Sequence, residues 1–158
     1  MNKVEKIVLT ILAIEHLGFG LYGLYDPYSI AELTGYILNS EFALSEIRAY
    51  YTLISALGFM ALFAIFIQSI VRQTYIIFAF MFGCILSGRI FNYLLTDELI
   101  TSIIVAMVAE AIVVGLALWR LIALRQETRS EIFVNNLKEK SAKIAAIYIR
   151  SAPIMEIL

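Results

Sequence analysis

Four long apolar segments dominate this chain of 158 residues and restrict what it can fold into. They are residues 7–25, 47–71, 75–95 and 99–123. Each is long enough for a helix that crosses the hydrocarbon core of a bilayer, which takes about 20 residues. Backbone groups in lipid must satisfy their own hydrogen bonds, so we predict that these segments are helices. A soluble bundle is disfavoured, because so short a chain has no outer layer to cover four helices that are apolar all round.

The composition indicates a membrane protein and argues against several other classes. Hydrophobic residues make up 61% of the sequence and charged residues 16%, whereas a soluble domain has about 25% charged residues. The net charge of −1 argues against a basic nucleic-acid-binding protein. The single cysteine, Cys84, forms no internal disulfide, and the single histidine, His16, cannot supply a multi-histidine metal site. We therefore expect no nucleic-acid partner, no metal site and no cofactor.

The charges and tyrosines favour one orientation in the membrane. Ten of the twelve basic residues fall on one side if both termini are cytoplasmic: Lys3, Lys6, Arg72, Arg120, Arg125, Arg129, Lys138, Lys140, Lys143 and Arg150. The other side carries acidic residues and no lysine: Asp26, Glu32, Glu41, Glu46, Asp97 and Glu98. Tyrosines gather near that second side: Tyr22, Tyr25, Tyr28, Tyr36, Tyr50, Tyr51 and Tyr93. Positive loops stay in the cytoplasm and aromatic residues mark the interfaces. We predict a multi-pass protein of the bacterial inner (plasma) membrane, surrounded by the lipid bilayer, with both termini cytoplasmic.

The predicted fold is all-α, a four-transmembrane-helix bundle over residues 1–124 followed by a cytoplasmic C-terminal amphipathic helix over residues 125–158. In this basic tail, Leu137, Ile144 and Tyr148 can share one helix face. Such a helix beside a membrane often lies on the anionic inner leaflet. We prefer contact with a membrane or a protein partner over a solvated extension of the fourth span.

The linker over residues 26–45 is the only long connection between the predicted spans. Ser29 and Glu32 have the spacing of a capping box, which indicates one short helical turn that ends near Gly35. Ser40 could cap an extension of the second span. The other connections are short, so sequential helices should be antiparallel neighbours.

Five ionisable residues lie inside the predicted spans: Glu15, His16, Arg48, Arg89 and Glu110. A charge at the bilayer centre costs about 2.5–3.5 kcal/mol on insertion scales, so we expect these side chains to face the bundle interior and to pair. A rise of about 1.5 Å per residue puts Glu15 and Glu110 near the middle of the membrane. Arg89 can then reach Glu110, Glu15 or Glu46, and this choice stays open.

Together with polar neighbours, these residues form a candidate ligand-binding or ion-pair cluster: Glu15, His16, Glu46, Arg48, Arg89, Asn92, Tyr93 and Glu110. The preferred interpretation is structural, with Arg89 in a buried ion pair that fixes helix packing. The alternative is a polar pocket that holds a ligand or relays protons, for which His16 has the most suitable titration range. A metal site is least favoured, because Glu15 and His16 point about 100° apart on a helix and no E-x-x-H spacing occurs.

Short motifs resemble a known protein family. They are GLYDP at residues 23–27, E-x-R-A-x-Y at residues 46–51, Gly88-Arg89 with Asp97 in the third span, and Glu110 in the fourth. They resemble a family of small four-helix bacterial membrane proteins described as a domain of unknown function. The resemblance covers residues 5–123 and not the tail, and Tyr51-Thr52 stands where that family tends to have Gly-Gly. It implies a four-helix bundle, no particular activity, and these family features: Glu46, Arg48, Arg89 and Glu110.

Three functions of different classes are compatible with these observations. The first, slightly preferred, is an accessory or scaffold subunit that acts through helix and tail contacts, because the chain is small and lacks catalytic motifs. The second is a membrane binding or transport protein for a lipid, quinone or small anion, which would use the Arg/Glu cluster. The third is an intramembrane acid–base enzyme that uses Glu15, His16 and Glu110. Whether the chain is an enzyme, and whether it assembles with another membrane protein or with its own copies, stays open.

Overall fold

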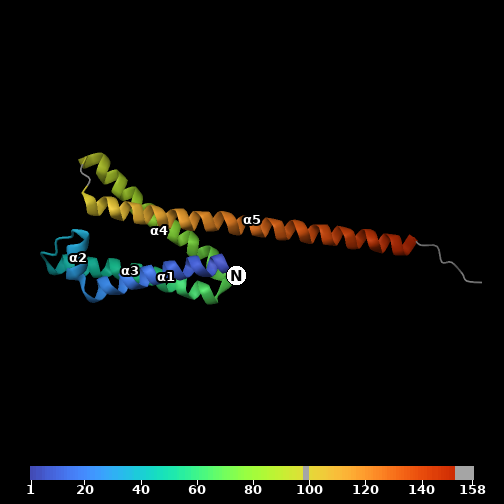
Figure 1. The fold of residues 1–158 in the computed structure, drawn as a ribbon, viewed down its shortest axis with the longest axis horizontal. Coiled ribbons are helices and arrows are strands. Elements are labelled where there is room, and N and C mark those ends of the chain that lie inside the picture. The colour runs from blue at the N-terminus through green and yellow to red at the C-terminus, as the bar shows by residue number, and fades with distance from the viewer. Residues whose placement is uncertain (98–99, 152–158) are drawn as a thin grey trace, which may run out of the picture. The chain divides into compact units, whose positions relative to one another are not determined.

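The computed structural model describes the backbone of residues 1–97 and 100–151 and the side chains as far as residue 146. All regular secondary structure in this part of the chain is helical. The helical elements are α1 (Lys3–Tyr25), α2 (Pro27–Thr34), α3 (Glu41–Phe66), the 3-10 turn η1 (Gln68–Ile70), α4 (Val71–Thr96) and α5 (Thr101–Ser151) (Figure 1). The predicted all-α class is confirmed. Four helical segments are long and apolar enough to cross a membrane: Lys3–Tyr25, Glu41–Phe66, Gln68–Thr96 and Thr101–Ala146.

Polar capping residues begin the first two long helices before their apolar segments start. The Asn2 side chain accepts a hydrogen bond from the Glu5 N–H at 2.8 Å, so α1 begins at Lys3. Ser40 Oγ accepts one from the Ala43 N–H at 3.1 Å and begins α3. The predicted cap at Ser40 is therefore confirmed.

The linker between α1 and α3 contains the complete helix α2, where the sequence predicted a single turn. Its cap is Asp26, three residues before the predicted Ser29. Asp26 Oδ2 accepts a hydrogen bond from the Ser29 hydroxyl at 2.7 Å, and Oδ1 accepts one from the Ser29 N–H at 3.2 Å. These bonds, the hydroxyl bond first, lower the pKa of the Asp26 carboxyl. The helix ends at Thr34, because Gly35 has a left-handed φ of 81°.

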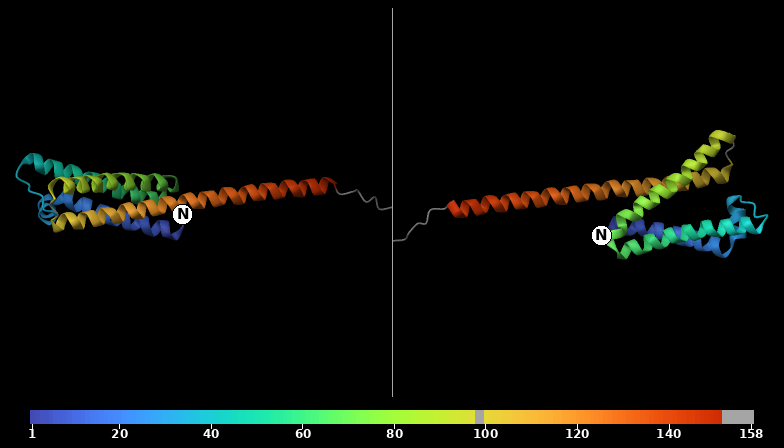
Figure 2. Two further views of the ribbon diagram at one scale, coloured as in Figure 1. Left: turned by 90° about the horizontal axis from the view of Figure 1, so that it is seen from above. Right: turned by 180° about the vertical axis from the view of Figure 1, so that it is seen from behind.

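The closest helix packing is between α1 and α3, which run side by side and are joined through α2 at one end (Figures 1 and 2). Glycines permit this approach. A Cβ atom would come within 2.4–2.6 Å of the facing helix at three positions: Gly20 against Ser55, Gly23 against the Tyr51 ring, and Gly58 against the Leu17 backbone. The close packing that the sequence predicted at Gly20 and Gly23 is therefore present.

The chain divides into two compact units, residues 1–121 and residues 122–158. The fourth span and the tail belong to one uninterrupted helix, α5, and the sequence has no proline between Thr101 and Ser151. In the second unit, every described side chain over residues 125–146 is exposed. The predicted start of the fourth span at Leu99, the side chain of Tyr148 and the chain after residue 151 lie outside the described residues.

Candidate functional site

Arg89 on α4 forms an ion pair with Glu110 on α5. Arg89 Nε lies 2.8 Å from Glu110 Oε1, which selects one of the three carboxylates that the sequence left open. Glu110 is buried, and the Arg89 side chain is 27% exposed. The second oxygen, Glu110 Oε2, has no hydrogen-bond partner in the described part of the chain. The pair ties α4 to α5 within the first unit and leaves part of the guanidinium accessible.

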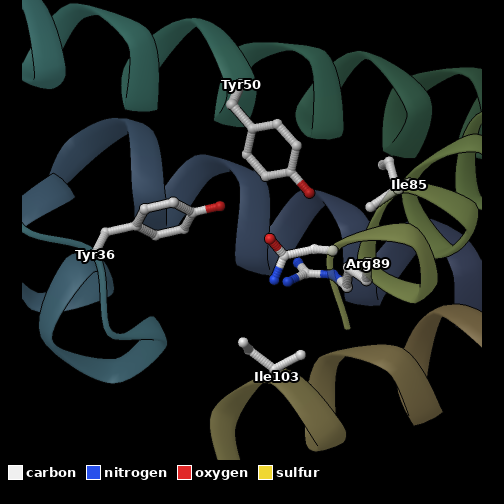
Figure 3. Close-up of a pocket in the computed structure, with 7 residues that line it drawn as sticks. Tyr36, Tyr50, Ile85, Arg89 and Ile103 are labelled. Atoms are coloured by element: carbon white, nitrogen blue, oxygen red, sulfur yellow. The ribbon is translucent and has the colours of Figure 1, made fainter. Parts of the chain in front are cut away.

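A pocket of about 280 Å³ lies beside this ion pair. The residues that line it are Tyr36, Tyr50, Ile85, Gly88, Arg89, Asn92 and Ile103. Figure 3 shows the hydroxyl ends of Tyr36 and Tyr50 directed toward the region of Arg89, with Ile85 and Ile103 on other sides. Tyr36 follows α2, Tyr50 belongs to α3, and Ile103 to α5, so the pocket depends on how several elements come together.

His16 is buried in aromatic surroundings on α1, away from the lining of this pocket. The rings of Phe78 and Phe82 meet it edge to face, with centroids 4.8 and 4.9 Å away. His16 Nδ1 lies 2.9 Å from the Leu12 carbonyl oxygen and 2.6 Å from Glu15 Oε2, so one ring N–H serves two acceptors. Nε2 has no hydrogen-bond partner among the described residues. This packing agrees with a structural histidine, and proton relay stays a prediction.

Besides His16 and Glu110, four members of the predicted cluster lie outside the pocket lining. Glu46 and Arg48 are exposed on α3, so the expectation that Arg48 faces the interior is wrong. The Glu15 side chain is 53% exposed, also against expectation. Tyr93 is half-buried outside the pocket lining. For Arg48, the reason is the rotation of α3, because Ile47 faces the core and the next residue points about 100° away.

A second buried ion pair joins Glu5 to Arg120 and was not predicted, since from the sequence Arg120 bears only on orientation and Glu5 is not a candidate site residue. Arg120 Nε donates to Glu5 Oε1 at 2.6 Å, and Arg120 Nη2 also donates to that oxygen. Both side chains are buried beside the fully buried Tyr75. The pair ties α5 to α1. A signal existed, since Glu5 is the only acid before the first span and Arg120 the only base within the predicted fourth span.

The two pocket tyrosines were also missed as site residues, because both were assigned to the aromatic belt. Tyr36 lies in a linker without periodicity, and Tyr50 is adjacent to Tyr51, which is buried against Gly23. Only the three-dimensional arrangement distinguishes Tyr50 from Tyr51. The sequence contains no signal that identifies Tyr36 as a pocket residue.

The arrangement at Arg89 is suited to binding and contains no metal-ligand set. A guanidinium, two phenol groups and the Asn92 amide line one pocket with apolar walls, which is a common composition for a small-molecule site. Among residues 1–97 and 100–146, whose side chains the structure describes, no group of three His, Cys, Asp or Glu could hold a metal ion. The chemistry that these side chains offer is hydrogen bonding to ligand oxygen atoms.

Comparison with known proteins gives a family and no activity. No curated protein and no solved structure matches the chain. One protein family, described as "Domain of unknown function (DUF4345)", matches residues 4–121. The matched region includes both buried ion pairs and the pocket, and it ends where the first compact unit ends. The match agrees with the predicted membership of a family described as a domain of unknown function. The chain belongs to the DUF4345 family.

Proposed function

We propose that this chain is a four-span integral membrane protein that binds oxygen atoms of a small ligand or lipid headgroup in the pocket beside Arg89. The membrane assignment is supported by the four long apolar helices and by the many large apolar side chains that are exposed on α4 and α5, among them Phe80, Phe91 and Val105. The binding role is carried by one observation: the hydroxyl ends of Tyr36 and Tyr50 are directed toward the region of Arg89, in the pocket that all three residues line (Figure 3).

The ion pair prepares Arg89 for this role. Glu110 accepts the Nε–H and so fixes the plane of the guanidinium. An arginine has five N–H donors, and within the described residues Arg89 makes no second hydrogen bond to a protein acceptor. The remaining donors can therefore serve a ligand. Because Glu110 already offsets much of the positive charge, the pocket favours a carbonyl oxygen or a singly charged carboxylate or phosphate over a multiply charged anion.

The pocket size restricts the ligand. Small-molecule sites usually measure about 300–1,000 Å³, so a pocket of about 280 Å³ takes a headgroup or a small molecule and not a whole lipid. Ile85 and Ile103 supply apolar walls. A lipid headgroup, a quinone ring and a small organic acid share this chemistry, and the mass of a retained ligand would distinguish them.

The test is native mass spectrometry of the chain after extraction in a mild detergent. We expect the wild-type protein to retain a small molecule, and Tyr50→Phe and Tyr36→Phe each to lower its occupancy. One lost hydrogen bond weakens binding by up to about 10-fold. Arg48→Gln is the matched control, because Arg48 is an exposed arginine outside the pocket and its loss should leave occupancy unchanged.

Arg89 needs a paired substitution, because Arg89→Gln alone would leave Glu110 buried without its partner. The double variant Arg89→Gln/Glu110→Gln removes both charges, keeps the shape of the side chain at position 110 and leaves a shorter polar side chain at position 89. We expect it to remain folded and to lose the ligand. Wild-type occupancy in this double variant would contradict the proposed function.

An accessory or scaffold function is the second candidate, and the second unit favours it. Phe133, Leu137 and Ile144 are half or more exposed on a helix that also carries several lysines. This function predicts that a stoichiometric protein partner copurifies with the full chain. The partner should be lost from the variant Phe133→Ser/Leu137→Ser and kept by Arg89→Gln/Glu110→Gln. The binding function predicts instead that a small molecule is kept by the first variant and lost from the second. Acid–base catalysis has less support, because the pocket lining includes none of its three proposed residues, Glu15, His16 and Glu110.

A further inference from the structure

A carboxyl group lies on the outer surface of α1, halfway along a helix long enough to cross a membrane. Glu15 is in the middle of Lys3–Tyr25, and its side chain is 53% exposed. The exposed side chains around it, including Ile11 and Ile14, are apolar. If α1 spans the bilayer, this carboxyl group faces hydrocarbon, where an ionisable side chain is rare and signals a function. The other acid of α1, Glu5, is buried against Arg120.

Glu15 contacts His16, but this contact gives its carboxylate no Lys or Arg partner. His16 Nδ1 lies 2.6 Å from Glu15 Oε2, but the same nitrogen also lies 2.9 Å from the Leu12 carbonyl oxygen. That nitrogen is therefore shared between two acceptors. The described residues give the Glu15 side chain no other hydrogen bond or ion pair, and no Lys or Arg among them pairs with it.

The surface beside Glu15 is open to a close neighbour. A Cβ atom placed on Gly18 would meet nothing within 4 Å, in contrast to Gly20 on the opposite face of α1. Ile11, Glu15, Gly18 and Tyr22 are spaced four, three and four residues apart and are all exposed. This is the spacing of a helix–helix interface, and a glycine within it lets a second backbone approach closely. We call these four residues the Glu15 stripe.

We propose that the Glu15 stripe docks a transmembrane helix of another protein, and that this helix carries a Lys or Arg at the depth of Glu15. Charge complementarity argues for this occupant. Arg89 and Arg120 are paired with Glu110 and Glu5. The exposed Arg48 and Arg72 lie near the first turns of their helices and not at mid-span.

A second copy of the chain fits the stripe less well. In the same orientation, it would bring one Glu15 against another and supply no cation. The proposal rests on the membrane assignment made above and is independent of the pocket at Arg89.

The experiment uses the full-length protein in phosphatidylcholine vesicles, with Cys84→Ser and a donor dye on Ser130→Cys. The probe is a polyleucine transmembrane peptide with one central Arg and an acceptor dye. Matched peptides have Leu at the centre, or Arg at one end of the apolar stretch. We expect energy transfer to report association with the central-Arg peptide at least 10-fold tighter than with either control. Glu15→Gln should abolish that preference, Gly18→Leu should weaken it, and Glu46→Gln, an exposed acid at the start of α3, should leave it unchanged.

Each outcome supports or overturns the proposal. Equal association of the three peptides with the wild-type protein, or undiminished association of Glu15→Gln with the central-Arg peptide, overturns it. An efficient disulfide between two chains carrying Gly18→Cys, in the Cys84→Ser background, assigns the stripe to a second copy and also overturns it. A chain that floats with the vesicles but ignores the peptide removes only the docking proposal. A chain that does not float removes the membrane assignment as well.

Discussion

Gly58 and Gly115 both lie inside helices, but only Gly58 faces another backbone. A Cβ atom on Gly58 would come 2.6 Å from Leu17 N, which cannot move without shifting α1, whereas one on Gly115 meets nothing within 4 Å. We expect Gly58→Ala to lower the free energy of unfolding by about 1–3 kcal/mol. Gly115→Ala should be neutral or raise it by up to about 1 kcal/mol, because alanine is the better helix former. Denaturant titration in detergent measures both, and equal stabilities would contradict the close approach of α1 and α3.

A second prediction at the scale of single residues concerns the buried ion pair of Glu5 and Arg120. Both Glu5 and Arg120 are almost completely buried, so Glu5→Gln would leave a buried guanidinium without its counter-charge. We expect a loss of about 3–5 kcal/mol in the free energy of unfolding. The double variant Glu5→Leu/Arg120→Met removes both charges and should recover most of that loss. If Glu5→Gln unfolds at the same denaturant concentration as the exposed-site control Glu46→Gln, the pair does not stabilise the fold.

The partners of these charged residues could not be chosen from the sequence, although the charges themselves could be found. Glu5 and Arg120 are 115 residues apart, and no local pattern connects them. Arg89 had three carboxylates within reach, and the choice depends on how each helix is rotated about its axis. That rotation follows from packing, for example from Gly20 and Gly58 facing the opposite backbone. The prediction that Arg48 faces the interior was wrong for this reason, because rotating a helix by one residue exchanges a buried position for an exposed one.

At the scale of elements, α2 begins at a cap formed by the Asp26 side chain. The hydrogen bonds from Ser29 lower the pKa of the Asp26 carboxyl below its usual value of 3.8. A lowered pKa in the folded state means that the cap is fully effective above that usual value and is lost as the pH falls through the lower, folded value. We expect Ser29→Ala to raise the pKa of Asp26 toward 3.8, because it removes the largest cause of the shift. An NMR titration of Asp26 measures this, with Ser45→Ala on α3 as the control. An unchanged midpoint in Ser29→Ala would contradict the capping geometry.

Element boundaries were predictable where they depend on local chemistry. Ser40 and Gly35 mark the start of α3 and the end of α2, because a cap and a left-handed turn each need only a few neighbouring residues. The extent of α5 was harder to predict. The sequence changes from apolar to charged residues after residue 123, but the helix is not interrupted. Helical hydrogen bonds join backbone groups, so they form with either kind of side chain.

At the scale of the whole molecule, the two ion pairs explain how α5 is joined to the rest of the first unit. Glu110 and Arg120 lie ten residues apart on α5, which is about 15 Å along a helix. One connects α5 to α4 and the other connects it to α1. In contrast, α1 and α3 are joined by glycine-mediated packing. If these helices lie in lipid as proposed, apolar contacts between them gain little, and a charged pair at each of two levels holds the part of α5 within the first unit more specifically than apolar side chains alone would.

If the chain spans a membrane as proposed, its orientation decides which side of that membrane the pocket faces. The distribution of Lys and Arg predicts that the linker before α3 lies outside and that the α3–α4 connection and the second unit lie inside. In a Cys84→Ser background, a membrane-impermeant maleimide should label Asn39→Cys in intact spheroplasts. It should label Ser69→Cys and Ser130→Cys only after the membrane is opened. All three positions are exposed, so poor reagent access within the fold would not explain a difference. Tyr36 belongs to the same linker as Asn39, so this result would make the pocket open toward the outer face and its ligand one that arrives from that side. The inverse labelling pattern would contradict the orientation and make the ligand cytoplasmic.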